Sequence, residues 1–266
     1  MKTFTSYSQH ADDYIAWQLL GKKNSGVVVE VGAFDGIHLS NSYSLNQLGW
    51  RSVCIEPSSE IFKYLEVHRP NSTNLNIAVV GDESIKEIDF YSEEIGVLSG
   101  CEYDEEDIKR RYKNRGIEYK EPSRTKVKAR TLNSVLSNID IENDSIDLIS
   151  IDVEGFELEV LKGLDLYKND IRLLIIEAND DKIKNKILNI FKKNKEYMFI
   201  GNNYQNLFFM KYKALSKKII RKIDFKDYVK ANQFHPKGEK YSIDSVSPEF
   251  IKSKELLKFQ KYLGLF

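Results

Sequence analysis

The sequence predicts an α/β fold in which helices cover both faces of a mostly parallel β-sheet. Short runs rich in β-branched residues alternate with stretches of helical apolar spacing, as they do in βαβ units. The first run leads into a glycine loop, Gly32 to Gly36, and the last helical stretch is followed by two strand-like runs around a turn. These observations indicate a nucleotide-binding type of sheet that ends in an antiparallel hairpin.

Buried strands are expected wherever a β-branched run follows a glycine or a polar turn. Gly26 precedes the first run and Asp144 precedes the fourth. Between the runs, apolar spacing such as that of Ile61, Phe62 and Leu65 fits helices packed on the sheet. The predicted strands are 27–31, 52–56, 74–79, 146–151 and 171–176.

The terminal hairpin favours one type of parallel sheet over another. After a helix at about 180–195, residues 197–210 form two strand-like runs around Gly201, Asn202 and Asn203. A seven-stranded, mostly parallel sheet that closes on such a hairpin is the arrangement of Rossmann-like class I methyltransferases, whereas dinucleotide dehydrogenases usually finish with another parallel unit. Hairpin edges also occur on other parallel sheets, so the dehydrogenase alternative stays open.

Two segments lie outside the βαβ repeat. Residues 81–130 form an insertion after the third strand, with a strand expected at 88–91 and a charged helix at 104–113. Residues 212–266 form a helical C-terminal tail whose last helix is expected to start at Ser247 and Pro248. We therefore expect a domain at 1–211, with 81–130 as a candidate lid over an acceptor, and an extension at 212–266 that docks on it or mediates a homodimer.

The glycine loop is unsuited to a pyrophosphate. A dinucleotide loop carries a middle glycine, which lets the backbone approach the phosphates. Here the residues between Gly32 and Gly36 are Ala33, Phe34 and Asp35, so the middle glycine is missing and an acid is present. A sulfonium cofactor has no phosphates and carries an ammonium group that acids can pair with.

Two glutamates at strand ends support a nucleoside cofactor. Glu30 lies in the first strand, and Glu56 ends the second strand about 20 residues after the loop, where a carboxylate can accept ribose hydroxyls. Glu56 indicates a ribose but does not distinguish the cofactor, because NAD proteins share this feature. The alternatives are a core carboxylate paired to a helix N–H for Glu30, and an ordinary acid at a helix start for Glu56.

Six short motifs occur in a specific order over residues 6 to 165, and together they resemble the FkbM-type S-adenosylmethionine-dependent methyltransferases. They are Tyr7-Ser8-Gln9-His10-Ala11-Asp12-Asp13, Val29-Glu30-Val31-Gly32-Ala33-Phe34-Asp35-Gly36, Ser40-Asn41-Ser42, Leu48-Gly49-Trp50 with Ile55-Glu56-Pro57, Arg130-Thr131-Leu132, and Ile151-Asp152-Val153-Glu154-Gly155. The family's first motif is usually Ser-Gln-x-Gly-Glu-Asp, and here Ala11 and Asp12 replace its Gly and Glu. Gln9 and Asp13 are therefore the residues that we carry over from it.

The resemblance implies methylation of a hydroxyl oxygen, often on a sugar, and it implies the residues that would bind the cofactor. Gln9 belongs to this set through the first motif. The other residues are, at the methionine end, Glu30, Gly32, Ala33, Asp35, Gly36, Ser40 and Asn41; at the ribose, Glu56, Pro57 and Ser58; and at the adenine, Ile77 and Ala78.

The fourth strand leads to the candidate catalytic residues. Asp152 and Glu154 follow it, at the carboxyl edge where ligands bind in open α/β sheets. A sugar hydroxyl needs a base or a metal to become a good nucleophile, and Asp152 is our first candidate for contact with both the cofactor and the reacting centre. His10, in the first motif, is a second candidate base; its alternative is a surface histidine near a helix start.

A divalent metal is a further prediction from the same edge of the sheet. Asp152 with Glu177 and Asn179, which follow the fifth strand, would offer the oxygen ligands that Mg²⁺ or Mn²⁺ prefers. Carboxylates at strand ends also commonly cap helices, and that alternative stays open.

The composition argues against a nucleic-acid-binding protein, a membrane protein and a disulfide- or zinc-stabilised protein. Forty basic and forty acidic residues cancel, so the electrostatic signature of a nucleic-acid-binding protein is missing. No stretch approaches the ~20 apolar residues of a membrane helix, and two isolated cysteines indicate neither a disulfide framework nor a zinc site. We expect a cytoplasmic protein with a small-molecule or nucleotide-sugar acceptor and without membrane insertion.

The sequence therefore predicts an S-adenosylmethionine-dependent O-methyltransferase that acts on a sugar hydroxyl, such as that of a nucleotide-activated sugar for surface polysaccharide biosynthesis. One rival is an NAD-dependent oxidoreductase on a similar sheet, which tighter binding of NAD than of S-adenosylhomocysteine would favour. The other is a non-catalytic cofactor-binding module, which cofactor binding without any methyl transfer would favour.

Overall fold

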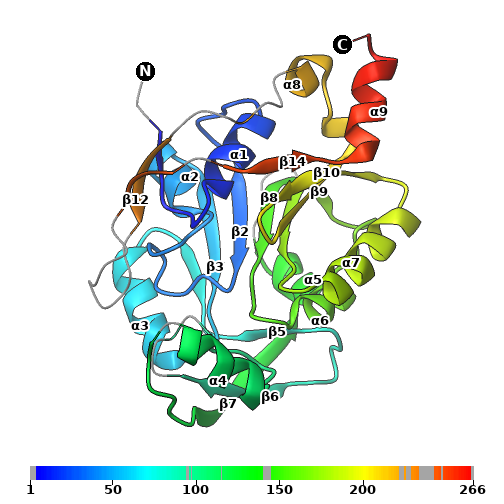
Figure 1. Ribbon diagram of the computed structural model, residues 1–266. Helices are drawn as coiled ribbons and strands as arrows, with labels where there is room; N and C mark the ends of the chain where they lie inside the picture. The colour runs from blue at the N-terminus through cyan, green and yellow to red at the C-terminus, as the bar shows by residue number, and fades with distance from the viewer. Residues whose placement is uncertain are drawn as a thin grey trace.

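An eight-stranded sheet forms the centre of the computed structural model (Figure 1). The structure describes residues 4–93, 96, 98–114, 116–139, 145–221, 225, 229–233, 243–246 and 248–264. In order across the sheet, the strands are β14 (Phe250–Lys252), β10 (Tyr197–Asn203), β11 (Asn206–Lys211), β9 (Asp170–Glu177), β8 (Ser145–Ile151), β2 (Val27–Val31), β3 (Arg51–Ile55) and β4 (Thr73–Leu75).

The sheet has a parallel part and an antiparallel part. Strands β9, β8, β2, β3 and β4 pair in parallel, whereas β10 pairs antiparallel with both β11 and β14, and β11 pairs antiparallel with β9. The mostly parallel sheet with a terminal hairpin is therefore confirmed. The sheet has one strand more than the predicted seven, because the C-terminal tail adds β14 to the edge of the hairpin.

Helices pack on both faces of the sheet. Their bounds are α1 (Asp12–Leu19), α2 (Tyr43–Leu48), α3 (Ser59–His68), α4 (Glu105–Asn114), α5 (Leu132–Ser137), α6 (Glu157–Lys162), α7 (Asp181–Lys193), α8 (Lys217–Arg221) and α9 (Lys254–Tyr262), with a short 3₁₀ turn at Tyr212–Ala214. Within the described parts of the chain, none of these helices has the length and apolarity needed to cross a bilayer.

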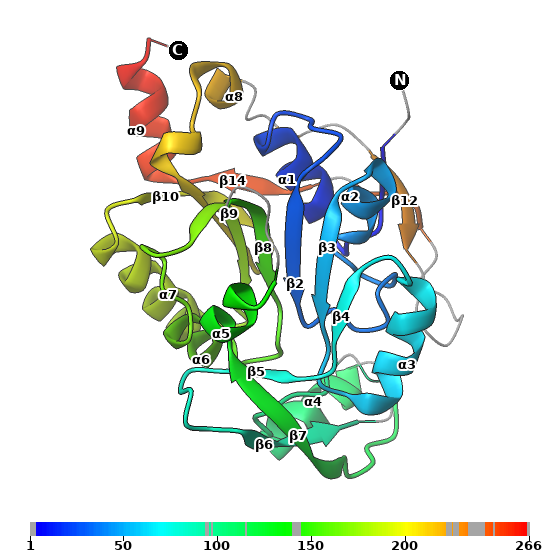
Figure 2. The same cartoon turned by 180° about the vertical axis from the view of Figure 1, so that it is seen from behind.

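Two apolar cores explain why the strands are apolar at consecutive positions. Side chains alternate between the two faces of a strand, and both faces of this sheet are covered. Val29 and Ile149 belong to a core with α5, α6 and α7, whereas Val28 and Leu148 belong to a second core with α1, α2 and α9. Figure 2 shows α5, α6 and α7 together, away from α2 and α3. The result is a three-layer α/β/α arrangement.

The predicted strand 74–79 is divided in two. β4 ends at Leu75, and β5 (Ala78–Val80) leaves the main sheet to pair with β7 (Ser123–Thr131), which in turn pairs with β6 (Glu87–Ser92). The side chain of Asn76 holds the bend, since its amide donates to the carbonyls of Glu56 and Pro57 at 2.8 and 3.0 Å. The insertion, with α4, lies at the end of the molecule opposite both termini (Figure 1).

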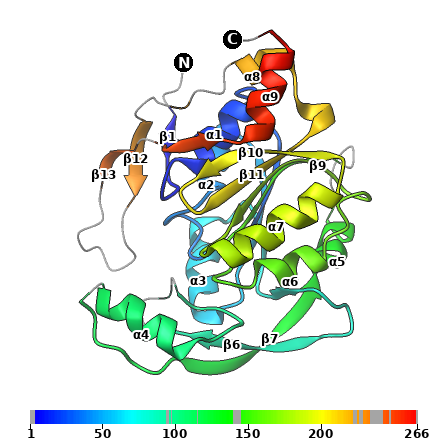
Figure 3. The same ribbon diagram turned by 45° about the vertical axis from the view of Figure 1, so that its right-hand side comes forward.

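The predicted start of the tail helix is wrong. Pro248 precedes a strand, β14, and α9 begins only after Ser253, whose side chain accepts a hydrogen bond from the backbone N–H of Leu256 at 2.9 Å; Ser247 lies outside the described residues. Pairing of β14 with β10 fixes these residues as a strand, and local sequence carries no signal of that pairing. Figure 3 shows α9 against the β10 edge.

The N-terminus and the tail also form a small sheet of their own. Its strands are β1 (Thr5–Ser6), β12 (Val229–Gln233) and β13 (Ile243–Val246), with β1 parallel to β12. The tail is thus attached at two places, through β12 to the N-terminal segment and through β14 to the main sheet.

Candidate active site

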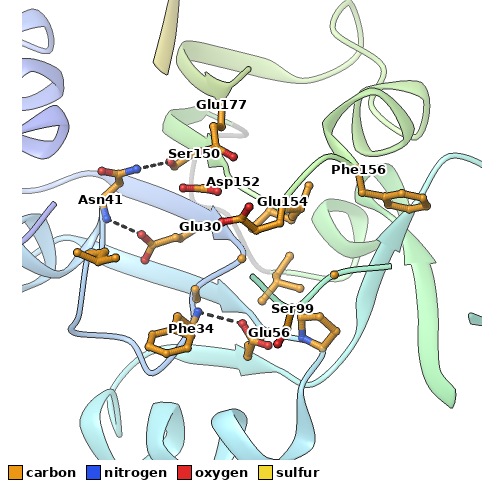
Figure 4. Close-up of a pocket in the computed structure, with 18 of the residues that line it drawn as sticks. Glu30, Phe34, Asn41, Glu56, Ser99, Ser150, Asp152, Glu154, Phe156 and Glu177 are labelled. Carbon is orange, nitrogen blue, oxygen red and sulfur yellow. Dashed lines mark hydrogen bonds between the residues drawn. The ribbon is translucent and has the colours of Figure 1, made fainter. Parts of the chain in front are cut away.

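A pocket of about 230 Å³ lies at the carboxyl ends of the parallel strands, where α/β sheets bind ligands (Figure 4). Its floor is made by residues at the ends of β2, β3, β8 and β9, including Gly32, Ile55, Asp152 and Glu177. The segment around Ser99, in the insertion, closes one side. The pocket therefore extends from the glycine loop to the fourth and fifth parallel strands.

The glycine loop uses its N–H groups within the protein. The N–H groups of Gly32 and Ala33 both donate to the carbonyl of Ile55, at 3.0 and 2.9 Å, and that of Phe34 donates to the Glu56 carboxylate at 3.0 Å. A Cβ atom at Gly32 would lie 1.8 Å from the backbone oxygen of Asp152, so glycine is required there by the close approach of the chain after β8. These donors are therefore already engaged and do not form a phosphate cradle.

Glu30 organises the chain that follows the loop. Its carboxylate accepts hydrogen bonds from the backbone N–H of Asn41 at 2.5 Å and from the hydroxyls of Ser40 and Ser42 at 2.8 and 2.6 Å. Burial raises its pKa, and the nearby positive charge of Arg69 opposes this. Figure 4 shows Glu30 directed at Asn41. One alternative for Glu30 was a core carboxylate paired to a helix N–H, and Glu30 is indeed buried and bonded to a backbone N–H, that of Asn41.

Asn41 provides an acceptor that the protein leaves unused. Its side-chain amide donates to the hydroxyl of Ser150 at 3.0 Å, and the residue lines the pocket. Its Oδ1 is buried and has no hydrogen-bond partner among the residues that the structure describes. A buried acceptor without a partner costs free energy, so a bound donor such as an ammonium group would stabilise this arrangement.

Glu56 marks the other end of the pocket. Its carboxylate accepts from the backbone N–H groups of Phe34 and Ser58, at 3.0 and 2.8 Å, and burial raises its pKa to about 8. Pro57, Ile77 and Ala78 line the same end of the pocket. Each carboxylate oxygen can accept a further hydrogen bond.

Four predicted site residues do not line the pocket. Asp35 bonds to the ring of His38 and to two backbone N–H groups of its own turn, and a side chain at Gly36 would meet Arg69 and Leu65. Ser58 caps α3 through the N–H of Ile61. The fourth, His10, stacks its ring on Tyr204, with 3.9 Å between the ring centroids. These residues surround the site without forming its wall.

Three carboxylates meet at the end of the pocket formed by β8 and β9. Oxygen atoms of Asp152, Glu154 and Glu177 lie within 4.8 Å of one another (Figure 4). Burial raises the pKa of all three groups, that of Glu154 to about 8, and the nearby charge of Asp152 adds to the shift of Glu154 and Glu177. Asn179 donates its amide to Glu177 at 2.7 Å. Such a group can hold a proton or a cation near neutral pH.

Arg111, from α4 in the insertion, is the single lysine or arginine among the described residues that line this pocket. Its Nη1 lies 2.8 Å from an oxygen of Glu154, and its charge lowers the pKa of Glu154 and Asp152 against the effect of burial. Sequence patterns gave no reason to single out Arg111, since it follows two other basic residues on a charged helix. Only the folded insertion brings it to the carboxylates.

Asp12 is a second pocket residue that the sequence did not assign to the site. It is fully buried, and its two oxygens accept from the side-chain amides of Asn203 and Asn206, at 2.8 and 3.0 Å. Burial raises its pKa to about 7, and the nearby Asp152 adds to this shift. The sequence does show an acid at this position of the first motif. It could not show that Asp12 is bound by Asn203 and Asn206, which lie almost 200 positions away in the sequence.

The comparisons with known proteins agree with a methyltransferase fold. Residues 30–202 match the Methyltransferase FkbM domain family, and no curated protein matches the chain. A rRNA-methylase structure from Clostridium thermocellum, described as putative in its name, has 8% identity and a TM-score of 0.41, covering 76% of this chain and 95% of that one. Precorrin-6y C5,15-methyltransferase from Geobacter metallireducens GS-15 has 10% identity and a TM-score of 0.40, covering 78% and 92%. The family match and the strand order confirm the predicted Rossmann-like class I fold.

Proposed function

The chain belongs to the FkbM methyltransferase family, and from this premise we propose that it is an S-adenosylmethionine-dependent O-methyltransferase that acts on a sugar hydroxyl. The observation that carries the proposal is the pocket itself. It joins a nucleoside end, with Glu56, Ile77 and Ala78, to a group of carboxylates at the ends of β8 and β9.

The cofactor end fits a sulfonium nucleoside better than a dinucleotide. The loop N–H groups that would hold a pyrophosphate are bonded to Ile55 and Glu56, and acids line the pocket from Glu30 to Glu177. Asn41 Oδ1, a buried acceptor, suits the ammonium of the methionine end, and Glu56 suits the ribose hydroxyls. The engaged loop N–H groups and the buried acceptor of Asn41 disfavour the NAD-dependent alternative, whereas Glu56 suits the ribose of either cofactor.

At the reacting end, the protein must align the acceptor oxygen and receive its proton. The cofactor supplies a methyl group that the sulfonium already activates, so positioning provides much of the rate acceleration. We assign Asp152 as the base, because it follows β8, lines the pocket and lies beside Glu154 and Glu177, which share its charge and proton. His10 remains a candidate at the rim, where its ring stacks on Tyr204.

A divalent cation is a second way to activate the acceptor hydroxyl. The predicted ligands were Asp152, Glu177 and Asn179, and the oxygens that lie within 4.8 Å of one another belong to Asp152, Glu154 and Glu177. Carboxylate oxygens suit Mg²⁺ or Mn²⁺, which would lower the pKa of a bound hydroxyl. Asn179 would then orient Glu177 through its 2.7 Å hydrogen bond.

Labelled methyl transfer tests the proposal. The protein is incubated with methyl-labelled S-adenosylmethionine and a panel of free, lipid-linked and nucleotide-linked sugars, with and without a chelator. We expect label in a carbohydrate product, and chelator sensitivity if the cation takes part. Label only in protein or nucleic acid would contradict the sugar acceptor, and tighter binding of NAD than of S-adenosylhomocysteine in calorimetry would favour the oxidoreductase.

The cellular setting follows from the same proposal. A sugar methyltransferase of this kind would act in the cytoplasm on building blocks for surface polysaccharide. The tail, which presents Leu257 and Tyr262 with 40% and 84% of their surface exposed, is the part we propose for a homodimer contact. Light scattering of the full chain measures that subunit count directly.

A further inference from the structure

A second hollow opens beside the active-site pocket. It is lined by residues after β9, at the start of α7 and in the β10–β11 turn: Ala178, Asn179, Asp180, Asp181, Lys184, Tyr204 and Gln205. Asn179 and Gln205 line both hollows, so the two are adjacent. The second hollow is therefore within reach of a second ring linked to one that reacts at Asp152.

Tyr204 presents an aromatic ring in this hollow and is held there from both sides. One face of the ring stacks on His10, with 3.9 Å between centroids and 24° between the planes, and the phenol hydroxyl bonds to Glu249 of the tail. Tyr204 is nevertheless 42% exposed, so part of it is accessible to a ligand. We call Tyr204, His10 and Glu249 the Tyr204 cluster.

The backbone at Tyr204 is set by the hairpin turn. Asn203 pairs with Asn206, so Tyr204 and Gln205 form a two-residue loop between β10 and β11. The φ of Tyr204, 48°, is the positive value that the first central residue of such a turn adopts. The turn therefore places the ring of Tyr204, which His10 and Glu249 then contact.

The three members of the Tyr204 cluster come from parts of the chain that the family match does not reach. That match covers residues 30–202, whereas the cluster combines position 10 of the N-terminal segment with positions 204 and 249. Residues 30–202 contain the cofactor loop and the carboxylates. The other lining residues of the hollow, such as Asn179 and Lys184, lie within the match, so the hollow combines both parts of the chain. A ring supplied from outside the match is suited to acceptor choice, which differs among enzymes that share one cofactor.

We propose that this hollow binds a second sugar ring, so that the acceptor is a saccharide of at least two linked rings. The inference rests on the proposed transfer to a sugar hydroxyl. A pyranose offers a C–H face to an aromatic ring and hydroxyl groups at its edge, and here Tyr204 is bordered by the polar side chains of Asn179, Lys184 and Gln205. A nucleotide would place its phosphates against Asp180 and Asp181, with Lys184 as the single basic residue in the described lining.

Methyl transfer to matched monosaccharides and disaccharides tests the proposal. The acceptors are the methyl glycosides of glucose, galactose, mannose and N-acetylglucosamine, each paired with its 1→4-linked disaccharide. For the sugar that accepts label, we expect kcat/KM to be roughly tenfold higher for the disaccharide. Tyr204→Ala should remove this advantage, whereas Tyr204→Phe, which keeps the ring, should retain most of it.

A matched control and a folding control accompany the variants. Tyr167 is another exposed tyrosine, 64% accessible and outside both hollows, so Tyr167→Ala should behave as the wild type. S-adenosylhomocysteine affinity, measured by calorimetry, should be the same in Tyr204→Ala as in the wild type, which shows that the variant is folded.

The outcomes separate this inference from the proposed function. Equal kcat/KM for a monosaccharide and its disaccharide, or an advantage that survives in Tyr204→Ala, would overturn the second-ring site and leave sugar methylation intact. A complete lack of label in every carbohydrate, while S-adenosylhomocysteine still binds, would overturn the sugar acceptor and this site with it.

Discussion

Glu56 combines a structural task with the proposed ribose contact. Its carboxylate holds the N–H groups of Phe34 and Ser58, and thereby joins the glycine loop to the chain after β3. We expect Glu56→Ala to weaken S-adenosylhomocysteine binding by roughly 10- to 100-fold, since charged hydrogen bonds are lost and two N–H groups are left without a partner. Titration calorimetry measures the affinity.

The isosteric variant sharpens this prediction. Glu56→Gln keeps an acceptor oxygen at the same place, so it should retain more affinity than Glu56→Ala. Glu60→Gln, an exposed glutamate on α3, should leave the affinity unchanged. An affinity of Glu56→Ala equal to that of the wild type would remove Glu56 from the cofactor site.

Asp152 is the proposed base, and its variant should separate turnover from cofactor binding. Asparagine keeps the shape of the side chain but cannot accept a proton as a carboxylate does, so Asp152→Asn should lower kcat by roughly 10²- to 10⁴-fold. Initial rates of labelled methyl transfer measure kcat, and calorimetry should show nearly unchanged cofactor affinity. An unchanged kcat would show that the reacting centre lies elsewhere in the pocket.

At the scale of elements, the insertion contacts the site through the segment around Ser99 and through an ion pair of α4. Arg111 of α4 lies 2.8 Å from Glu154, in a group of carboxylates that has no other arginine or lysine in the described pocket lining. Arg111→Met would leave these charges uncompensated and release α4, so we expect kcat/KM to fall by roughly tenfold. The pair is partly exposed, which limits the effect.

The same helix supplies the control for Arg111. Arg110 is 71% exposed and pairs with Asp107, away from the pocket, so Arg110→Met should retain wild-type activity. Steady-state rates of the two variants are compared under the same conditions. Equal activities would mean that the ion pair between α4 and Glu154 has no part in the reaction.

The elements that the sequence predicts well are those whose pattern is local. Buried parallel strands such as β2 and β8 agree with the predicted ranges to within a residue, because continuous apolar runs bounded by turns define them. The predicted strand 74–79 is divided because β5 pairs with β7, about 50 residues later, and the tail helix starts late because β14 pairs with β10. Strand pairing between residues far apart in the sequence produces no pattern in the local sequence.

The residues of the candidate site also differ in whether a local sequence pattern could predict them. The proposed cofactor residues Glu30, Asn41 and Glu56 occur in contiguous motifs, so the sequence could single them out, and all three line one pocket. Arg111 and Asp12 could not be predicted, since each acquires its meaning only from partners on distant elements. Electrostatic interactions between residues far apart in the sequence can be identified only once the fold is known.

At the scale of the whole molecule, the sheet divides the work between its segments. The parallel strands and their loops, within residues 30–202, contribute the proposed cofactor end of the pocket and the carboxylates. The N-terminal segment and the hairpin add Gln9, Asp12 and Asn206 to the same pocket. These segments meet the tail through contacts such as that of Asn203 with Asp12 and with the backbone N–H of Glu249. Under the proposed function, differences in these segments would alter acceptor choice.

Stability should depend on pH in a direction set by the buried acids. Burial raises the pKa of Asp12 from 3.8 to about 7 and that of Glu56 from 4.5 to about 8. Between the unfolded and folded values, the folded state binds more protons than the unfolded state. The free energy of unfolding therefore falls as pH rises through this window, from about pH 4 to about pH 8.

We expect the Tm of the cofactor-free protein to decrease between about pH 5 and pH 8.5, by roughly 2–4 °C for each kcal/mol lost. Circular dichroism melts in buffers of constant ionic strength measure this slope. The double variant Asp12→Asn, Glu56→Gln cannot ionise at these positions, so its Tm should vary less with pH than that of the wild type. A Tm that rises over this range would mean that both carboxylates are ionised in the folded protein, stabilised by their amide and backbone donors more than burial destabilises them.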